Sequence, residues 1–176
     1  MKSKRTTRLA AAVAVVATVL AAAVPVADAA VYSNGSKTIT FDVTMKIIAD
    51  CTIAANPLDF GQSQGILATA VSVNTTMSVT CTNTTPYNVG LNAGTGTGST
   101  VAARVLSGTG ANTSTVAFNL FQAAGTTNWG NTQGTDTRSG TGTGSSQTLT
   151  VYGVVPAQST PQPDTYKSTI TATVYF

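Results

Sequence analysis

Two runs of alternating apolar and polar residues constrain this chain most. The first, near the start, alternates around the apolar residues Ile39, Phe41, Val43, Met45 and Ile47. The second reaches the last residue through Ile170, Ala172, Val174 and Phe176. Alternation with a period of two predicts a strand that buries one face. We therefore expect a β-strand at each end, and ask whether the two strands serve the same domain.

The first thirty residues have the three-part pattern of a secretory signal. Basic residues lead, residues 9–24 are apolar apart from Thr18, and Ala27-Asp28-Ala29 gives a small-x-small cleavage site. An uncleaved membrane anchor is the alternative, but the apolar run is short for a membrane span. We predict that residues 1–30 are a signal peptide, cleaved after Ala29 or Ala30.

Removal of this signal leaves a chain without net charge. Four of the nine basic residues and one of the six acidic residues lie in the signal, so 9 − 4 = 5 bases balance 6 − 1 = 5 acids. A nucleic-acid-binding surface needs a basic stripe, and none remains, so we predict no nucleic-acid partner. Near-zero charge also leaves little repulsion between copies.

Cys51 and Cys81 are the two cysteines of this exported chain. An oxidising compartment favours a disulfide between them. Closing a loop of about thirty residues stabilises a fold by roughly 3–4 kcal/mol in the chain-entropy model. Two thiols without any histidine cannot complete a zinc site, so we predict neither a metal nor a cofactor.

Further strand-like runs fill the rest of the chain, separated by turn residues. We expect strands over residues 71–81, 87–91, 101–106, 116–121, 149–155 and 166–176. The first of these is expected to be irregular near Thr75 and Thr76. Residues 93–100 and 134–147, rich in Gly, Thr and Ser, lack the lysine of a phosphate-binding loop and are expected to be flexible loops. About seven strands with no helical period predict an all-β sandwich.

The residues for common hydrolytic chemistry are missing. No histidine is present to activate a nucleophile, and the five remaining Asp residues are scattered. Asp50 and Asp59 are interpreted as turn and cap residues. Trp129 suits a plug over the sandwich end better than a platform for a sugar. We predict that the protein is not an enzyme and has no catalytic residues.

Several segments together resemble a known family. They are Ala49-Asp50-Cys51-Thr52, Leu58-Asp59-Phe60-Gly61, Val79-Thr80-Cys81-Thr82, residues 85–94 (TPYNVGLNAG), Arg104, residues 118–121 (FNLF), Trp129-Gly130, residues 149–158 (LTVYGVVPAQ) and Tyr166. In this order the chain resembles the spore coat protein U domain, the pilin domain of archaic chaperone–usher pili. The family often has tyrosines at Phe118 and Phe121, commonly Gly at Asp164, and Asp at Ser168. These departures do not change the expected fold.

The resemblance implies an incomplete immunoglobulin-like β-sandwich that lacks its last strand. A periplasmic chaperone would fill the groove first, and the N-terminal strand of the next subunit would replace it at an outer-membrane usher. The resulting polymer, of this subunit and related pilins, would be an extracellular fibre for surface attachment and biofilm formation. The donor segment is expected within residues 31–47, and the sandwich over residues 48–176.

Residues 36–47 are the expected donor, with Ile39, Phe41, Val43 and Met45 facing inward. The groove edge is expected on the C-terminal strand, at Ile170, Ala172, Val174 and Phe176. Residues 36–53 could instead form one long first strand of the same domain, although the stretch up to Cys51 is already about sixteen residues, which is long for one strand. Two other functions remain open at this point. One is a spore or cell-surface coat protein, and the other is a secreted carbohydrate-binding module.

Overall fold

A computed structural model describes residues 35–62 and 67–176, so the predicted signal peptide lies outside the described residues. All regular structure within these ranges is β-strand, which confirms the all-β prediction. None of the described residues belongs to a helix suited to crossing a membrane. The strands are β1 (Cys51–Ala55), β2 (Val71–Cys81), β3 (Pro86–Leu91), β4 (Arg104–Ser107), β5 (Thr115–Ala123), β6 (Thr127–Asn128), β7 (Arg138–Thr141), β8 (Gln147–Val155) and β9 (Ala172–Tyr175).

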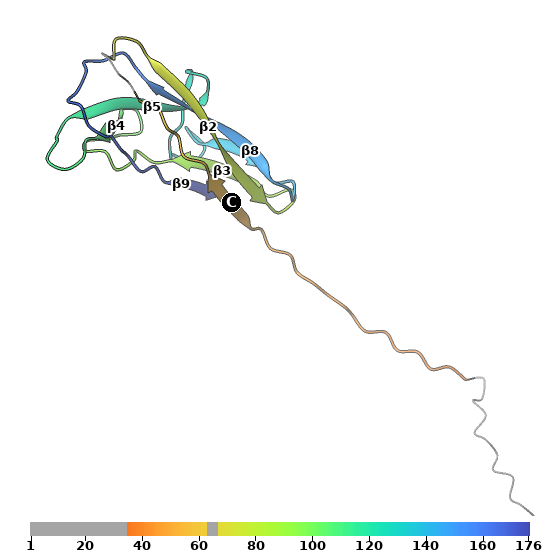
Figure 1. Cartoon of the computed structure of the whole chain (residues 1–176). Coiled ribbons are helices and arrows are strands. Elements are labelled where there is room, and N and C mark those ends of the chain that lie inside the picture. Colours follow the sequence, from red (N-terminus) through yellow and green to blue (C-terminus); the bar gives the residue numbers. More distant parts are fainter. Residues whose placement is uncertain (1–34, 63–66) are drawn as a thin grey trace, which may run out of the picture. The chain divides into compact units, whose positions relative to one another are not determined.

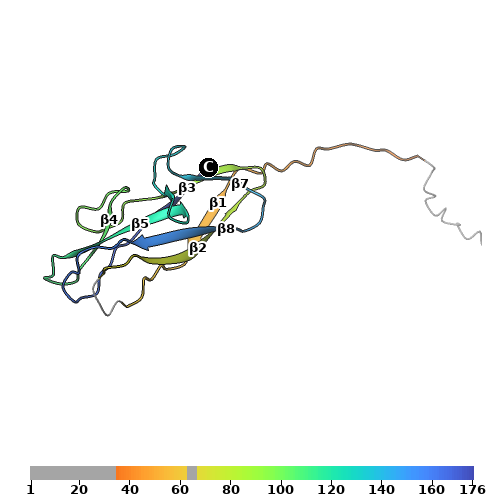
Figure 2. The same ribbon diagram turned by 90° about the horizontal axis from the view of Figure 1, so that it is seen from above.

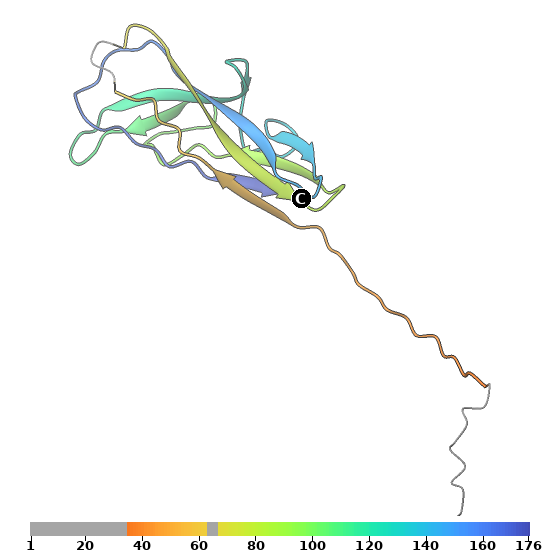
Figure 3. The same cartoon turned by 45° about the vertical axis from the view of Figure 1, so that its right-hand side comes forward.

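Two antiparallel sheets form a sandwich (Figures 1 and 2). The larger sheet has the order β1-β2-β8-β5-β4, with β6 paired to β5. The smaller sheet has the order β7-β3-β9. Strands β1 and β9 are therefore edge strands of different sheets. They lie close together with their arrowheads in opposite directions (Figures 1 and 3).

The core follows from alternation along the longest strands. On β2 the odd-numbered residues Met77, Val79 and Cys81 are buried, and on β8 Leu149, Val151 and Val155 are buried. Alternate residues of a strand face opposite sides of its sheet, so one face of each strand supplies the core. Trp129, Phe118, Leu120 and the β3 residues Tyr87, Val89 and Leu91 complete it.

Three local expectations need correction. The register of β2 with β8 is continuous from Val71 to Val79, so the irregularity expected at Thr75 and Thr76 is absent from this pairing. The expected loop 134–147 contains β7, which pairs with β3 because Gly140 leaves room for the ring of Tyr87. The expected strand 101–106 begins only at Arg104.

The C-terminal strand is also shorter than expected. Only β9 is a regular strand, although the segment before it forms an isolated bridge between Lys167 and Ser107. This segment first meets β4 of the larger sheet and then pairs with β3 of the smaller one. It is therefore an edge shared between the two layers.

Residues 35–50 form no strand, and their side chains are exposed. The structure does not contain the single long strand over residues 36–53 that the sequence left as an alternative, since β1 begins at Cys51. Ile39, Phe41, Val43 and Met45 are 82–90% exposed. Large apolar side chains in such numbers are seldom left in water unless they have a partner.

Candidate strand-acceptor groove

The outer edge of β1 carries backbone groups that do not pair with β2. Thr82 donates its N–H to the carbonyl of Asp50, and Asn56 donates to the carbonyl of Thr76, so even-numbered residues pair with β2. The N–H and C=O groups of the odd-numbered residues therefore point away from β2. The side chains of Cys51 and Ile53 pack on the core, so this open edge borders the interior.

The C-terminal segment has a second open edge. Asn92 donates its N–H to the carbonyl of Thr171, and Lys167 exchanges two hydrogen bonds with Ser107. Odd-numbered residues are thus paired, and the backbone groups of the even-numbered residues point the other way. Ile170, Ala172 and Val174 also pack their side chains on the core. The predicted groove-edge residues therefore share one edge, except that Phe176 lies beyond β9 and is 58% exposed.

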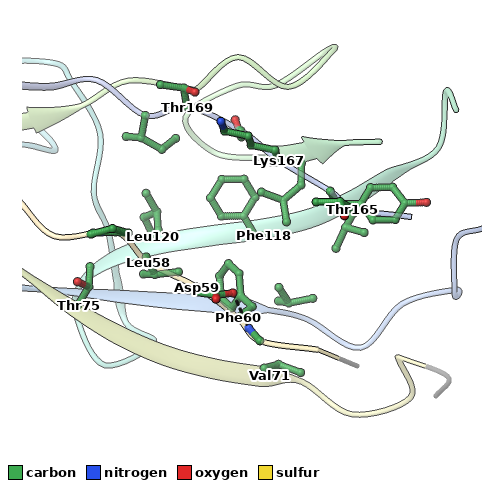
Figure 4. Close-up of a pocket in the computed structure, with 18 of the residues that line it drawn as sticks. Leu58, Asp59, Phe60, Val71, Thr75, Phe118, Leu120, Thr165, Lys167 and Thr169 are labelled. Atoms are coloured by element: carbon green, nitrogen blue, oxygen red, sulfur yellow. Dashed lines mark hydrogen bonds between the residues drawn. The ribbon is translucent and has the colours of Figure 1, made fainter. Parts of the chain in front are cut away.

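A groove with a volume of about 1340 Å³ lies against this C-terminal edge (Figure 4). Its apolar lining comes from both sheets and includes Val71, Met77, Leu91, Leu106, Val116, Phe118, Leu120, Val151, Val155, Ile170 and Ala172. Residues 165–170 of the C-terminal segment also line it. An open apolar groove bordered by an unpaired strand edge can accept an extended segment by strand addition.

One wall of the groove is a segment that pairs with no strand in the described chain. After β1, Leu58 and Phe60 pack on the core, and Phe60 meets Phe118 edge-to-face with ring centroids 6.2 Å apart (Figure 4). Asp59 accepts a hydrogen bond from the N–H of Gly61 at 2.8 Å, as its predicted turn role requires. A Cβ atom at Gly153 would lie 2.8 Å from Cδ1 of Leu58, so the glycine makes room for this wall.

The rim of the groove is held by one carboxylate. Asp164 accepts hydrogen bonds from the N–H and hydroxyl of Thr109, from Nδ2 of Asn112 and from the N–H of Thr165. These bonds, led by the Thr109 hydroxyl and the Asn112 amide, lower the pKa of Asp164 to about 2. Asn112 also donates to the hydroxyl of Tyr166, which donates to the carbonyl of Gln162. The loop before the C-terminal edge therefore has a fixed shape.

The disulfide predicted from the sequence is confirmed and lies at the β1 edge. Cys51 and Cys81 are directly opposite each other, with Cα atoms 4.1 Å apart. Such a short distance is typical of a pair that does not exchange backbone hydrogen bonds. Asp50 caps this edge by accepting the N–H of Cys51 at 3.0 Å, which fits its predicted turn role.

Trp129 is fully buried, and its indole Nε1 donates to the carbonyl of Val89 at 2.8 Å. A buried indole cannot stack on a sugar. Trp129 is instead part of the core, a role similar to the predicted plug over the sandwich end. No cluster of three or more potential metal ligands occurs among residues 35–62 and 67–176.

The sequence predicted a groove edge at Ile170, Ala172, Val174 and Phe176, of which Ile170 and Ala172 line the groove. Two further parts of the groove were not predicted. In the sequence, the wall at Leu58 and Phe60 is only a short apolar segment between turn residues, and no role in a groove was predicted for it. The rim was missed because Asp164 is bound by residues more than fifty positions away. The residues expected to donate a strand lie in the exposed N-terminal segment described above.

The profile of the Spore Coat Protein U domain matches residues 37–173. The chain belongs to this family. The match covers both the exposed alternating segment and nearly all of the sandwich, so the Spore Coat Protein U domain includes residues outside the folded core. A comparison with curated proteins gave no match.

One solved structure with a TM-score above 0.5 shows the same fold. This is the complex of the chaperone CsuC with the tip adhesion subunit CsuE, from archaic chaperone–usher Csu pili of Acinetobacter baumannii. It has a TM-score of 0.54 and 23% identity, and the match covers 74% of this chain but only 40% of that one. The Escherichia coli Hda pilus minor tip subunit HdaB matches with a TM-score of 0.36 and 17% identity, covering 70% of this chain and 78% of its own.

Proposed function

We propose that this Spore Coat Protein U domain protein is a polymerising subunit of a chaperone–usher pilus. Residues 36–47 of one copy act as the donor strand for the groove of the next. The observation that carries the proposal is that one chain has both an open groove and an exposed segment that could fill such a groove. An apolar groove has an open strand edge, and a separate alternating segment leaves its apolar side chains in water.

The two features are both apolar. The C-terminal edge lines the groove with Tyr166, Ile170 and Ala172, whose side chains pack on the core. The donor presents four inward side chains, Ile39, Phe41, Val43 and Met45. Burial of four such side chains is worth roughly 6–12 kcal/mol before the cost of ordering the segment. A slip by one residue would turn Asp42 into the groove, so the register is expected to be fixed.

The length of the connection favours a donor from another copy. A donor antiparallel to the C-terminal edge runs parallel to β1, since the two edges run in opposite directions (Figure 3). Two parallel strands of one chain need a crossover of about a dozen residues or more. Only residues 48–50 separate the donor from β1. A donor from the same chain could therefore fill the groove only if it ran parallel to the C-terminal edge. A donor from a second copy can run in either direction.

A chaperone and an usher complete the proposal. CsuE, which shares the fold, forms a pre-assembly complex with its chaperone CsuC. An open groove exposes apolar surface and an unpaired edge, which favour aggregation during export. We propose that a periplasmic chaperone covers the groove, and that an outer-membrane usher exchanges it for the donor of the next subunit. The product would be an extracellular fibre at the cell surface.

A matched pair of substitutions tests the donor. Phe41→Asp places a charge on the inward face, while Thr40→Asp places the same charge on the outward face one residue away. With a cognate chaperone, the wild type and Thr40→Asp should give heat-dissociable ladders on unheated gels and fibres in electron micrographs. Phe41→Asp and a chain lacking residues 31–46 should remain chaperone-bound monomers. Normal fibres from Phe41→Asp would refute the donor assignment.

Trypsin provides an independent readout. Lys37 and Lys46 lie in the exposed segment, whereas Arg104 is fully buried and Lys167 is held by Ser107. Trypsin should release the segment from unassembled subunits, leaving a chain that begins at Ile47. Assembled subunits should keep it. Equal cleavage in both states would mean that the segment stays in solvent.

A coat layer is the second candidate, because the family is named for a spore coat protein. The same strand exchange could build either assembly. Electron microscopy separates them, since a pilus gives thin filaments and a coat gives an amorphous layer.

A further inference from the structure

The apolar pattern of the donor leaves its register partly open. Ile39, Phe41, Val43, Met45 and Ile47 are all apolar and occupy every second position. A slip of one residue would turn all of these side chains to the other face, but a slip of two keeps an apolar side chain at each inward position. Because the hydrophobic effect is not directional, apolar burial separates registers two residues apart only weakly. A different feature has to choose among them.

The outward face of the groove edge carries one charged side chain. Residues 165, 167, 169 and 171 are exposed, and all of them are threonine except Lys167 (Figure 4). Within the described ranges, the hydrogen bonds of Lys167 are those of its backbone with Ser107. On the outward face of the donor, Asp42 is the one acidic residue among residues 36–47. The two faces therefore carry charges of opposite sign.

Lys167 also has a favourable place in the expected strand ladder. Its N–H and C=O both bond to Ser107 of β4. A donor on the free side would bond to the backbone of Tyr166 and Ser168, and the donor residue opposite Lys167 would form a non-hydrogen-bonded pair. The Cα atoms of such a pair are about 4.5 Å apart, so their side chains are closer than in the hydrogen-bonded pairs. A charge at that donor position acts strongly on Lys167.

We propose that Asp42 of the donor lies directly opposite Lys167 of the accepting copy, and that this ion pair selects the register. The inference rests on the proposed function, with the donor antiparallel to the C-terminal edge. One step along both strands, Phe41 then lies opposite Ser168, on the inward face. The two residues that flank Ser168 on this face, Tyr166 and Ile170, are larger and pack on the core.

The position of Ser168 has room for the ring of Phe41. The hydroxyl of Ser168 accepts the N–H of Thr95 at 3.1 Å and the N–H of Gly96 at 3.2 Å. These bonds hold the small side chain against the loop after β3. The largest side chain of the donor therefore faces the smallest of the three acceptor positions in the same register that pairs Asp42 with Lys167.

Charge disfavours both registers that lie two residues away. A slip in one direction would place Asp42 opposite Thr165, next to the carboxylate of Asp164. A slip in the other direction would place Lys46 opposite Thr165, where it becomes a diagonal neighbour of Lys167. Each slip weakens the attraction between Asp42 and Lys167 and brings two like charges closer together.

The ion pair acts on register and on the choice of donor more than on total affinity. An exposed pair contributes little and is screened by salt, whereas the inward apolar side chains provide most of the binding free energy. Opposite charges in the correct register and like charges in a wrong one give specificity. The groove of this chain should therefore prefer donors with an acidic residue at the position of Asp42, and discriminate against donors with a basic residue there.

Reversal of the charges tests the pair in full-length chains exported with a cognate chaperone. Asp42→Lys or Lys167→Asp alone should lower the temperature at which the ladder dissociates on gels by several degrees. The double variant should recover most of that loss. Asp42→Lys combined with Thr148→Asp, on the exposed face of β8, has the same net charge and should not recover it. A double variant no more heat-resistant than the weaker single variant would overturn the inference.

Disulfide trapping measures the register without changing either charge. In the proposed register Thr40 lies opposite Thr169, in a non-hydrogen-bonded pair whose Cα separation of about 4.5 Å suits a disulfide. Oxidised fibres of the Thr40→Cys and Thr169→Cys variant should give covalent multimers on non-reducing gels. Thr40→Cys with Thr171→Cys, which reports a slip of two residues, should give several-fold fewer.

The outcomes separate this inference from the proposed function. Equal trapping in the two cysteine variants, or more in the second, overturns the selected register while the wild-type ladder still supports strand exchange. Adding Asp42→Lys to the first cysteine variant should lower its trapping several-fold, and unchanged trapping would overturn the role of the charge. Absence of any wild-type ladder overturns the proposed function, and this inference with it.

Discussion

Nη2 of Arg104 donates to the carbonyl oxygen of Trp129 at 2.6 Å, and both side chains are fully buried. The same guanidinium donates to the carbonyls of Leu91, Asn92 and Val101. Four carbonyls from three separate segments thus share one planar group of donors. Burial lowers the pKa of Arg104 to about 10, although Asp136 partly opposes this.

Replacement of Arg104 should therefore destabilise the sandwich. Arg104→Met removes every donor and leaves buried carbonyls unsatisfied, at about 1–3 kcal/mol each. We expect a loss of about 3 kcal/mol or more in the free energy of unfolding, and a smaller loss for Arg104→Lys, which keeps the charge but not the planar fork. Urea unfolding, followed by the fluorescence of the single Trp129, measures both. Full stability in Arg104→Met would contradict this role.

Asp164 should make the stability of the rim depend on pH. Its pKa is lowered from 3.8 to about 2 in the folded chain. The folded state therefore prefers the ionised carboxylate, and this stabilisation is present above about pH 4 and lost as the pH falls towards about 2. Asp164→Asn should lower the urea midpoint at neutral pH, and the difference from wild type should shrink in acid. A constant difference, or the same loss in Asp42→Asn in the exposed segment, would argue against it.

The disulfide should stabilise the edge strand β1, whose last residue, Ala55, lines the groove. Cys51 and Cys81 join β1 to β2, and the chain before Cys51 has no other covalent link to the sheet. The Cys51→Ser and Cys81→Ser double variant should lose about 2–4 kcal/mol of stability. It should also yield less chaperone complex on export. Reduction of the wild-type chain should reproduce the loss, and an unchanged urea midpoint after reduction would exclude this role.

Gly153 should control the wall of the groove. Gly153→Val would push Leu58 and Phe60 off the inner face of β8, because even a Cβ atom there lies only 2.8 Å from Leu58. We expect a loss of about 1–3 kcal/mol and slower uptake of the donor. Val154→Ala on the outward face is the control. Adding Phe60→Ala should recover part of the loss in Gly153→Val, and strict additivity of the two would mean that they do not interact.

Several parts of this fold were predictable because local sequence carries their physical cause. Alternation along residues 71–81 and 149–155 specified which side chains face the core, since the strand period is two. Two cysteines in a chain with a predicted secretory signal predicted their disulfide. The terminal run at Ile170, Ala172 and Val174 likewise indicated side chains that pack on the core.

Other parts were decided only when distant segments met. Strand β7 forms within a Gly- and Thr-rich stretch because it can pair with the edge of β3. The local sequence of this stretch contains no strand pattern that predicts the pairing. The bonds to Arg104 and Asp164 come from residues far away in sequence, so the sequence alone could not assign their partners. The sequence determined which strands have an apolar face, because that depends on neighbouring residues. Tertiary structure decided which edges stay open, because an edge is defined by the strand that does not pair with it.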